Sequence, residues 1–141
     1  MKQAVHLILV SLFLEKEGQI LLMERQLLQG GGFTLPGGHV DANETAYKAL
    51  KREVFEETGI KIKSKNLRLI HVMHRKTPGL PKIHLFFVAD IFKGEPVAAE
   101  PNLIQSVAWY NTNELPSRTH SAALKAFAAY QNGQMYSEHN W

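Results

Sequence analysis

Apolar residues gather in short runs along the chain, and stretches rich in glycine, proline or charge separate these runs. Such runs are typical of β-strands when turn residues bound them. The pattern predicts strands over the following segments: Ala4–Leu14, Gln19–Arg25, Phe33–Leu35, Leu67–Arg75, Ile83–Phe92 and Val107–Tyr110. A turn at Glu15–Gly18 joins the first pair into a predicted hairpin, and the turn Lys76–Pro81 does the same for a second, longer hairpin.

Helices are predicted in two other segments. The first, Thr45–Thr58, contains no Gly or Pro, and its apolar residues recur at spacings of three and four: Ala46, Ala49, Leu50 and Val54. Asp41, with Glu44 three residues later, predicts the N-terminal cap of this helix, and Gly59 predicts its C-terminal stop. The second predicted helix is Ser121–Gln131, whose alanines and larger apolar residues supply a packing face.

Length and element order limit the fold class. With 141 residues, 45% of them hydrophobic, the chain is expected to form a single domain over residues 1–141 with a substantial core. The order of strands, helix, strands and helix predicts an α+β fold with a mixed β-sheet between helices. The chain has no cysteine, so disulfides and thiolate chemistry are excluded.

Charge and hydropathy limit the partners. The net charge of +3 would attract anionic substrates, but the basic residues do not form the stripe typical of nucleic-acid binders, so we expect no nucleic-acid partner. Ala4–Leu14 is as apolar as the core of a signal peptide, yet a turn follows it and no small-residue cleavage site does. No apolar run approaches the roughly 20 residues of a membrane span. We therefore expect a cytoplasmic protein without a membrane partner.

Acidic side chains concentrate in the second half of the first predicted helix. Glu53, Glu56 and Glu57 are spaced i, i+3 and i+4, which puts them on one helix face. Like charges in that arrangement repel one another unless a cation neutralises them. Oxygen ligands favour a hard ion, so the pattern predicts a site for Mg²⁺, with Mn²⁺ as the alternative ion.

The residues around these glutamates resemble the Nudix box. Gly38 is followed after five residues by Glu44, and after seven more by the run from Arg52 to Ile60, without a departure at any fixed position. The resemblance is closest to the small MutT-like branch. It implies a Nudix-type α/β/α sandwich and a Mg²⁺-dependent hydrolase that converts a nucleoside triphosphate, oxidised ones included, to the monophosphate and pyrophosphate.

Other functions remain open at this level. A nucleoside diphosphate linked to another moiety, such as ADP-ribose, NADH or a nucleotide sugar, would use the same box, and only the pocket walls would decide between these substrates. A non-catalytic nucleotide-binding module is a second alternative, although it has no need of so many carboxylates. An RNA-decapping module is a third, and the absence of a basic patch argues against it.

The resemblance also implies roles for single residues. It makes Glu53, Glu56 and Glu57 metal ligands, together with the carbonyl of Gly37 and with Glu100 from a later loop, and one of the box glutamates is a candidate to take the proton of the attacking water. Arg52 is suited to orienting a neighbouring carboxylate. Glu44 is either part of this catalytic set or only the capping partner of Asp41.

Basic residues outside the box are candidates for substrate contacts. Arg25 at the end of the second strand is either solvated or a phosphate ligand. His39 directly follows the glycines, and the resemblance implies a basic residue near substrate phosphate there. His74 and Arg75 are the candidates from the later strands. Histidines in those strands, including His71 and His84, share no metal-ligand spacing with a carboxylate. They are expected on the sheet surface or, as the alternative, at substrate contacts.

The C-terminal tail is the last feature with a structural implication. Gln134–Trp141 is polar but carries Tyr136 and Trp141. Aromatic residues so near a terminus indicate that the tail folds back onto the body or onto another subunit. A homodimer is therefore one expectation.

Overall fold

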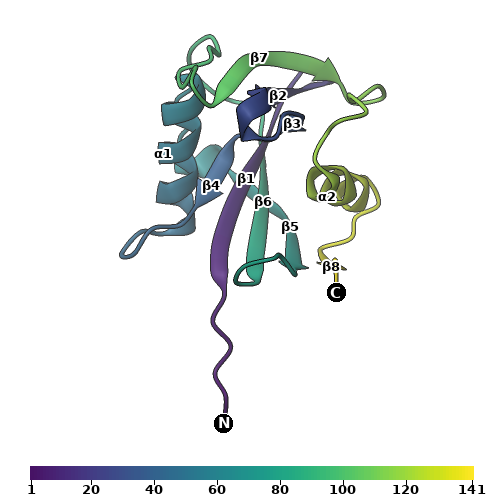
Figure 1. The fold of residues 1–141 in the computed structure, drawn as a ribbon. Coiled ribbons are helices and arrows are strands. Elements are labelled where there is room, and N and C mark those ends of the chain that lie inside the picture. Colours follow the sequence, from purple (N-terminus) through teal and green to yellow (C-terminus); the bar gives the residue numbers. More distant parts are fainter.

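A mixed β-sheet forms the middle of the molecule, with a helix on either face (Figure 1). The computed structural model describes residues 1–141. Its strands are β1 (Leu7–Lys16), β2 (Gln19–Arg25), β3 (Phe33–Thr34), β4 (Gly37–His39), β5 (Arg68–Arg75), β6 (Lys82–Ala89), β7 (Ile104–Asn111) and β8 (Tyr136–His139). The helices are α1 (Ala46–Thr58) and α2 (Ser121–Gln131), and short 3-10 turns cover Leu27–Gln29 and Ser64–Asn66. The predicted α/β/α sandwich is confirmed.

The strand order explains why the sheet is mixed. The path runs β3-β2-β1-β6-β5-β8, while β4 pairs with β1 and β7 pairs with β2. β1 runs parallel to β6, and β8 runs parallel to β5, whereas the other pairs are antiparallel. The predicted first hairpin pairs only beside its turn, at Glu15↔Ile20 and Lys16↔Gln19. Beyond these pairs β1 joins β4 and β6, while β2 joins β3 and β7.

Each face of the sheet has its own core. The apolar stripe of α1 (Ala49, Leu50 and Val54) is fully buried against residues of β1 and β2. The alanine-rich face of α2 packs with Phe127 against Phe13 and Phe86 on the opposite face. Because strand side chains alternate between faces, neighbouring residues of β1 serve both cores. The box helix is thereby fixed against the middle of the sheet.

Helix α1 occupies the predicted segment, but a different residue caps its N-terminus. Its N-cap is Thr45, whose side chain accepts a hydrogen bond from Lys48 N at 3.2 Å, so the prediction of Asp41 as the cap is wrong. Asn43 has a φ of 66°, a left-handed conformation that asparagine tolerates, and it interrupts any helix running from Asp41. Asp41 N instead donates to Glu44 Oε1 at 2.9 Å within the loop.

Strands β4 and β8 were missed because neither carries an apolar alternation. β4 consists of Gly37, Gly38 and His39 and pairs with β1. β8 forms from the polar tail, which folds back onto the body, and Trp141 Nε1 donates to His74 O at 2.9 Å. The predicted strand Ile83–Phe92 ends at Ala89 instead. No helix is both long and apolar enough to cross a membrane.

Candidate functional site

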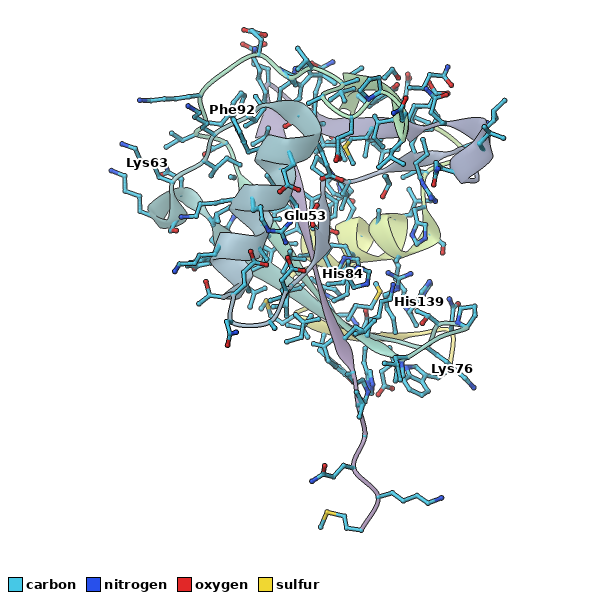
Figure 2. All side chains as sticks on the ribbon, turned by 60° about the vertical axis from the view of Figure 1, so that its left-hand side comes forward. Glu53, Lys63, Lys76, His84, Phe92 and His139 are labelled. Atoms are coloured by element: carbon cyan, nitrogen blue, oxygen red, sulfur yellow. The ribbon has the colours of Figure 1, made fainter.

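The box glutamates lie on the side of α1 that approaches strand β4. Figure 2 shows Glu53 projecting from α1 toward the centre of the molecule. The side chain of Glu53 is 19% exposed and that of Glu56 is 46% exposed. Gly59 ends the helix with a φ of 76°, and its N–H bonds to Phe55 O. The helix therefore ends one residue after Glu57, and its last two turns carry all three glutamates.

Arg52 connects the carboxylates. Its Nε and Nη2 donate to Glu44 at 2.8 and 3.0 Å, and its Nη1 donates to Glu53 at 2.9 Å and to Glu56 at 3.4 Å. Nη2 also reaches His39 O at 3.2 Å. These bonds hold the pKa of Glu44 down at about 2. Glu44 is thus bound to Arg52 as well as to Asp41.

The glycines of β4 allow the helix and strand to meet closely. A Cβ on Gly38 would lie 2.5 Å from Glu53 Cδ, and one on Gly37 would lie 2.0 Å from Val10 O. Gly37 N donates to Glu57 Oε1 at 2.9 Å. The backbone of β4 therefore forms one wall of the carboxylate cluster, with no room for a side chain at Gly37 and room at Gly38 only if Glu53 moves.

A fourth carboxylate reaches the cluster from the loop between β6 and β7. This loop is fixed to the end of α1 by Val97 N to Thr58 O at 3.0 Å and Ala99 N to Glu57 O at 3.1 Å. Glu100 follows directly, and its charge raises the pKa of both Glu53 and Glu57. The structure thus brings Glu100 to the box glutamates.

The electrostatics of this cluster fit a divalent cation. Burial raises the pKa of Glu57 to about 8, and the neighbouring charges of Glu53, Glu100 and Glu56 act in the same direction, although the bond from Gly37 N opposes them. Burial also raises the pKa of Glu53, against the effect of Arg52. The side chains do not yet form a ready-made metal site, since no group of three acidic or histidine side chains is arranged to hold one ion. Glu53 and Glu56 bond to Arg52 instead, and Glu57 bonds to Gly37 N. The donors are oxygens around a buried negative charge, which suits Mg²⁺ or Mn²⁺.

A pocket opens beside Glu57. It has a volume of about 200 Å³ and is lined by Arg25, Gly37 and Glu57 together with Met23, Gln29, Thr34, Leu35, Leu103 and Ile104. The pairing of β2 with β7 shifts register between Glu24 and Arg25. A bulge of this kind changes the direction of a side chain. Arg25 therefore shares a cavity with the carboxylate cluster.

The largest hollow lies elsewhere. It measures about 500 Å³, and lysines and apolar residues line it: Lys61, Ile62, Lys63, Lys65, Asn66, Ile91, Phe92 and Lys93. Figure 2 shows Lys63 and Phe92 at the opposite side of the view from His139. This hollow contains no acidic side chain and none of the predicted site residues. The chemistry of the smaller pocket, rather than size, makes it the candidate substrate site.

The remaining predicted contacts lie in other surroundings. His39 is exposed, and its carbonyl is bound by Arg52. His74 contacts His6, with the two Nε2 atoms 2.8 Å apart, and the ring of Trp141, rather than the box glutamates. Arg75 is nearly buried, and its Nη1 lies 3.1 Å from His84 Nδ1.

The expected location is wrong for two histidines, and two basic residues near Arg75 were not among the predicted contacts. His71 and His84 were expected on the sheet surface, but His71 is fully buried and His84 is 5% exposed. Hydrogen bonds compensate both of them, from His71 to Gln134 O and Ser137 Oγ and from His84 to Ser11 Oγ. The alternation of β6 could have predicted the burial of His84, because His84 shares a strand face with the core residues Phe86 and Val88. Lys82 and His120, beside Arg75, had no local signal.

Comparison with known proteins adds the family and its relatives. The NUDIX domain profile matches residues 5–130. An ADP-ribose pyrophosphatase of Methanocaldococcus jannaschii is 32% identical over 123 residues, which are 85% of this chain and 72% of that protein. An NAD-capped RNA hydrolase NudC of Photorhabdus laumondii is 35% identical over 103 residues. That match covers 73% of this chain but only 38% of the relative's length.

Solved structures share the fold. A MutT NUDIX hydrolase from Burkholderia pseudomallei superposes with a TM-score of 0.80 at 28% identity, over 88% of this chain and 97% of that one. The E. coli ORF135 protein gives a TM-score of 0.75 at 25% identity, over 91% and 92% of the two chains. Since the family profile spans most of the chain and the fold is that of a MutT NUDIX hydrolase, the protein belongs to the Nudix hydrolases and acts on pyrophosphate bonds.

Proposed function

We propose that this Nudix hydrolase cleaves a nucleoside diphosphate linked to another moiety, with ADP-ribose as the first candidate. One observation supports this substrate class above the others. The ADP-ribose pyrophosphatase of M. jannaschii is 32% identical to this chain, and the match extends over most of both proteins. This match ranks a diphosphate-linked substrate above a nucleoside triphosphate, whereas the resemblance of the box to the MutT-like branch implies the opposite ranking.

The divalent cation would be held by oxygen ligands of the carboxylate cluster: Glu53, Glu56, Glu57, Glu100 and the carbonyl of Gly37. When bound, such a cation makes water nucleophilic at neutral pH and screens the charge on the phosphates. Arg52 keeps Glu44 and Glu53 in place through its fork of hydrogen bonds. Mutual repulsion among these glutamates favours occupancy of the site.

Different residues of the protein then bind the phosphate and take the proton during hydrolysis. The guanidinium of Arg25 binds a phosphate in the pocket that it shares with Glu57. A glutamate of the box takes the proton of the attacking water, and the water oxygen forms the new bond to phosphorus. The anhydride bond breaks, and its oxygen leaves on the other phosphate. From ADP-ribose the products are AMP and ribose 5-phosphate.

A nucleoside triphosphate is the second candidate substrate. The structural likeness to a MutT NUDIX hydrolase, at a TM-score of 0.80 and 28% identity, favours it. The same carboxylates would serve, and the products would be a nucleoside monophosphate and pyrophosphate. The two candidates therefore differ in their products and can be separated by them.

A substrate panel with product identification tests this proposal. ADP-ribose, NADH, nucleotide sugars and canonical and oxidised nucleoside triphosphates are each incubated with the protein and Mg²⁺, and with Mn²⁺ in parallel. We expect turnover of diphosphate-linked compounds, with ADP-ribose among the best. Pyrophosphate released from triphosphates alone would replace this substrate class by the second candidate.

Matched variants connect the activity to the site. Glu56→Gln should lower the rate on the order of a thousandfold, because a metal ligand is lost while size is kept. Glu100→Gln should also lower it, whereas Glu95→Gln, an exposed glutamate earlier in the same loop, should not. A wild-type rate in Glu56→Gln would rule out the assigned site, and no Glu56-dependent turnover of any compound would point to a binding module.

A further inference from the structure

Arg75 is a buried cation without a counterion. The residue is 9% exposed, and its Nε is buried with no hydrogen-bond partner. Every ion pair within 4.0 Å in this protein belongs to Arg52, so no carboxylate neutralises Arg75. Taking a guanidinium out of water without an anion is costly. The position is therefore suited to an anion that comes from outside the chain.

The one partner of Arg75 orients it without neutralising it. A guanidinium only donates hydrogen bonds, so His84 Nδ1 must accept the bond from Arg75 Nη1. His84 therefore carries its proton on Nε2 and donates it to Ser11 Oγ at 2.7 Å. The ring also stacks on Phe86, with centroids 3.8 Å apart. A neutral, fixed His84 holds one arm of Arg75 and leaves Nε without a partner.

Other basic side chains gather around Arg75 on the α2 side of the sheet. Strand pairing places His139 and Lys82 directly on either side of Arg75, across β8, β5 and β6. Leu9 pairs with both His84 and His39, which continues the same face across β1 to β4. We call this set the basic face: His39, Arg75, Lys82, His84, His120 and His139. Figure 2 shows His84 and His139 beside α2.

The start of α2 adds further donors to the basic face. His120 is the N-cap of α2 and makes no side-chain capping bond, so backbone N–H groups of the first turn have no capping acceptor. Ser121 Oγ lies 3.3 Å from His139 Nε2, which places this turn at the basic face. The N-terminus of a helix favours negative charge.

The electrostatics agree with this arrangement. Burial lowers the pKa of Lys82 and of His120, and the positive charge of Arg75 lowers both further. No acidic group offsets these effects at Arg75, Lys82, His84 or His120. Each basic group thus makes the protonated form of its neighbours less favourable. An anion bound among them would stabilise the protonated forms.

We propose that the basic face is a binding site for a phosphate group, with Arg75 as its central ligand and Lys82, His120 and the first turn of α2 around it. Contacts link this site to the carboxylate cluster: His84 bonds to Ser11, Ser11 pairs with Gly37, and Gly37 bonds to Glu57. The assignment of the phosphate to the substrate rests on the proposed function. The existence of the site does not.

Binding of inorganic phosphate, measured without catalysis, tests the site. The ¹⁵N-labelled protein is titrated with phosphate in EDTA at constant ionic strength, and amide shifts are followed. We expect saturable shifts at residues 120–123 and around Arg75. Arg75→Gln should weaken the affinity by about tenfold or more, because a charge-assisted bond is lost. Lys76→Gln removes the same charge from the next, exposed residue and should leave the affinity unchanged.

A second variant keeps the test valid if Arg75→Gln does not fold. His120→Ala changes a residue of the basic face that lies outside the core and should also weaken phosphate binding. Unsaturable shifts, or an affinity that neither Arg75→Gln nor His120→Ala lowers, would overturn the proposal. Because metal and turnover are excluded from this experiment, failure of the proposed function would leave its result unaffected.

Kinetics of the same variants identify the source of the phosphate. If the group belongs to the substrate, Arg75→Gln should raise KM with little change in kcat, while Lys76→Gln changes neither. If phosphate binding weakens in Arg75→Gln but KM stays the same for every substrate turned over, the site holds free phosphate instead. Either outcome keeps the site and decides what fills it.

Discussion

Arg52 is the residue through which the carboxylates of the cluster are held together. Its bidentate bond to Glu44 and its third nitrogen on Glu53 use the planar fork of the guanidinium, which a lysine cannot reproduce. We predict that Arg52→Lys lowers activity by about 10- to 100-fold, the range found when groups that orient metal ligands are removed. Steady-state kinetics and Mg²⁺ titration measure this. Unchanged Mg²⁺ affinity and rate would show that the fork has no orienting role, and Arg68→Lys is the control.

Glu57 is the most confined carboxylate of the cluster. Its burial and the nearby charges of Glu53 and Glu100 make its ionised form unfavourable, and a cation would compensate this. We predict that Mg²⁺ raises the melting temperature of the wild type, and that Glu57→Gln abolishes most of this increase without lowering stability in EDTA. Thermal unfolding with and without Mg²⁺ measures both effects. An equal Mg²⁺ response in the variant would remove Glu57 from the ligand set.

His84 makes stability depend on pH. Burial, and then the charge of Arg75 with those of His120, Lys82 and His39, holds the pKa of His84 well below 6.5 in the folded chain. The unfolded chain takes up this proton as the pH falls below 6.5, and the folded chain does not, so the stabilisation is complete above pH 6.5 and is lost below it.

We therefore predict that the free energy of unfolding falls from pH 7 to pH 5, and that it falls less in His84→Gln. The contribution of a single such group is limited to about 1.4 kcal/mol per pH unit. Urea denaturation across this range measures it. An identical pH dependence in the two proteins would show that His84 takes up its proton in the folded state.

At the scale of elements, the contact of α1 with β4 decides whether the carboxylates can assemble. A methyl group on Gly37 would meet the backbone oxygen of Val10, whereas one on Gly38 would meet only the movable end of Glu53. We predict that Gly37→Ala destabilises the fold by about 2 kcal/mol or more, and that Gly38→Ala keeps the fold but loses most of the activity. Unfolding curves and rates for both variants measure this. Full activity in Gly38→Ala would place Glu53 outside the reacting geometry.

The elements also show how far sequence reasoning extends. β2 and α2 have the predicted bounds because their apolar patterns decide their structure locally. β4 and β8 have no such pattern, and they form because β1 and β5 offer open edges to segments distant in sequence. The N-cap of α1 depended on the left-handed conformation of Asn43, which composition does not reveal.

The same distinction applies to the candidate site. The glutamates of the box could be predicted from their spacing, since one helix presents all of them. Glu100 was expected only from the family resemblance, and its charge does act on the box glutamates. His39 and Arg75 were named as single candidates, but the basic face as a set could not be predicted. Its members come from β4, β5, β6, β8 and the start of α2, and only strand pairing brings them together.

For the molecule as a whole, the carboxylate cluster and the basic face occupy different sides of the sheet. The carboxylates lie on the α1 side and the basic face lies on the α2 side, with β4 between them. A substrate with a pyrophosphate at the carboxylates could extend past β4 to the basic face. The tail places Trp141 against His74 of the same chain, where Trp141 is still 62% exposed. The single domain and the homodimer stay predictions, which calorimetry and analytical ultracentrifugation test.

Hydrolysis of ADP-ribose in ¹⁸O-labelled water, with mass spectrometry of the products, tests the central claim most directly. The wild type with Mg²⁺ should give AMP and ribose 5-phosphate, with one ¹⁸O atom in one of the two products, and Glu56→Gln should give neither above background. Intact ADP-ribose under conditions where triphosphates release pyrophosphate would contradict the proposed substrate class. Equal turnover by Glu56→Gln would contradict the site itself.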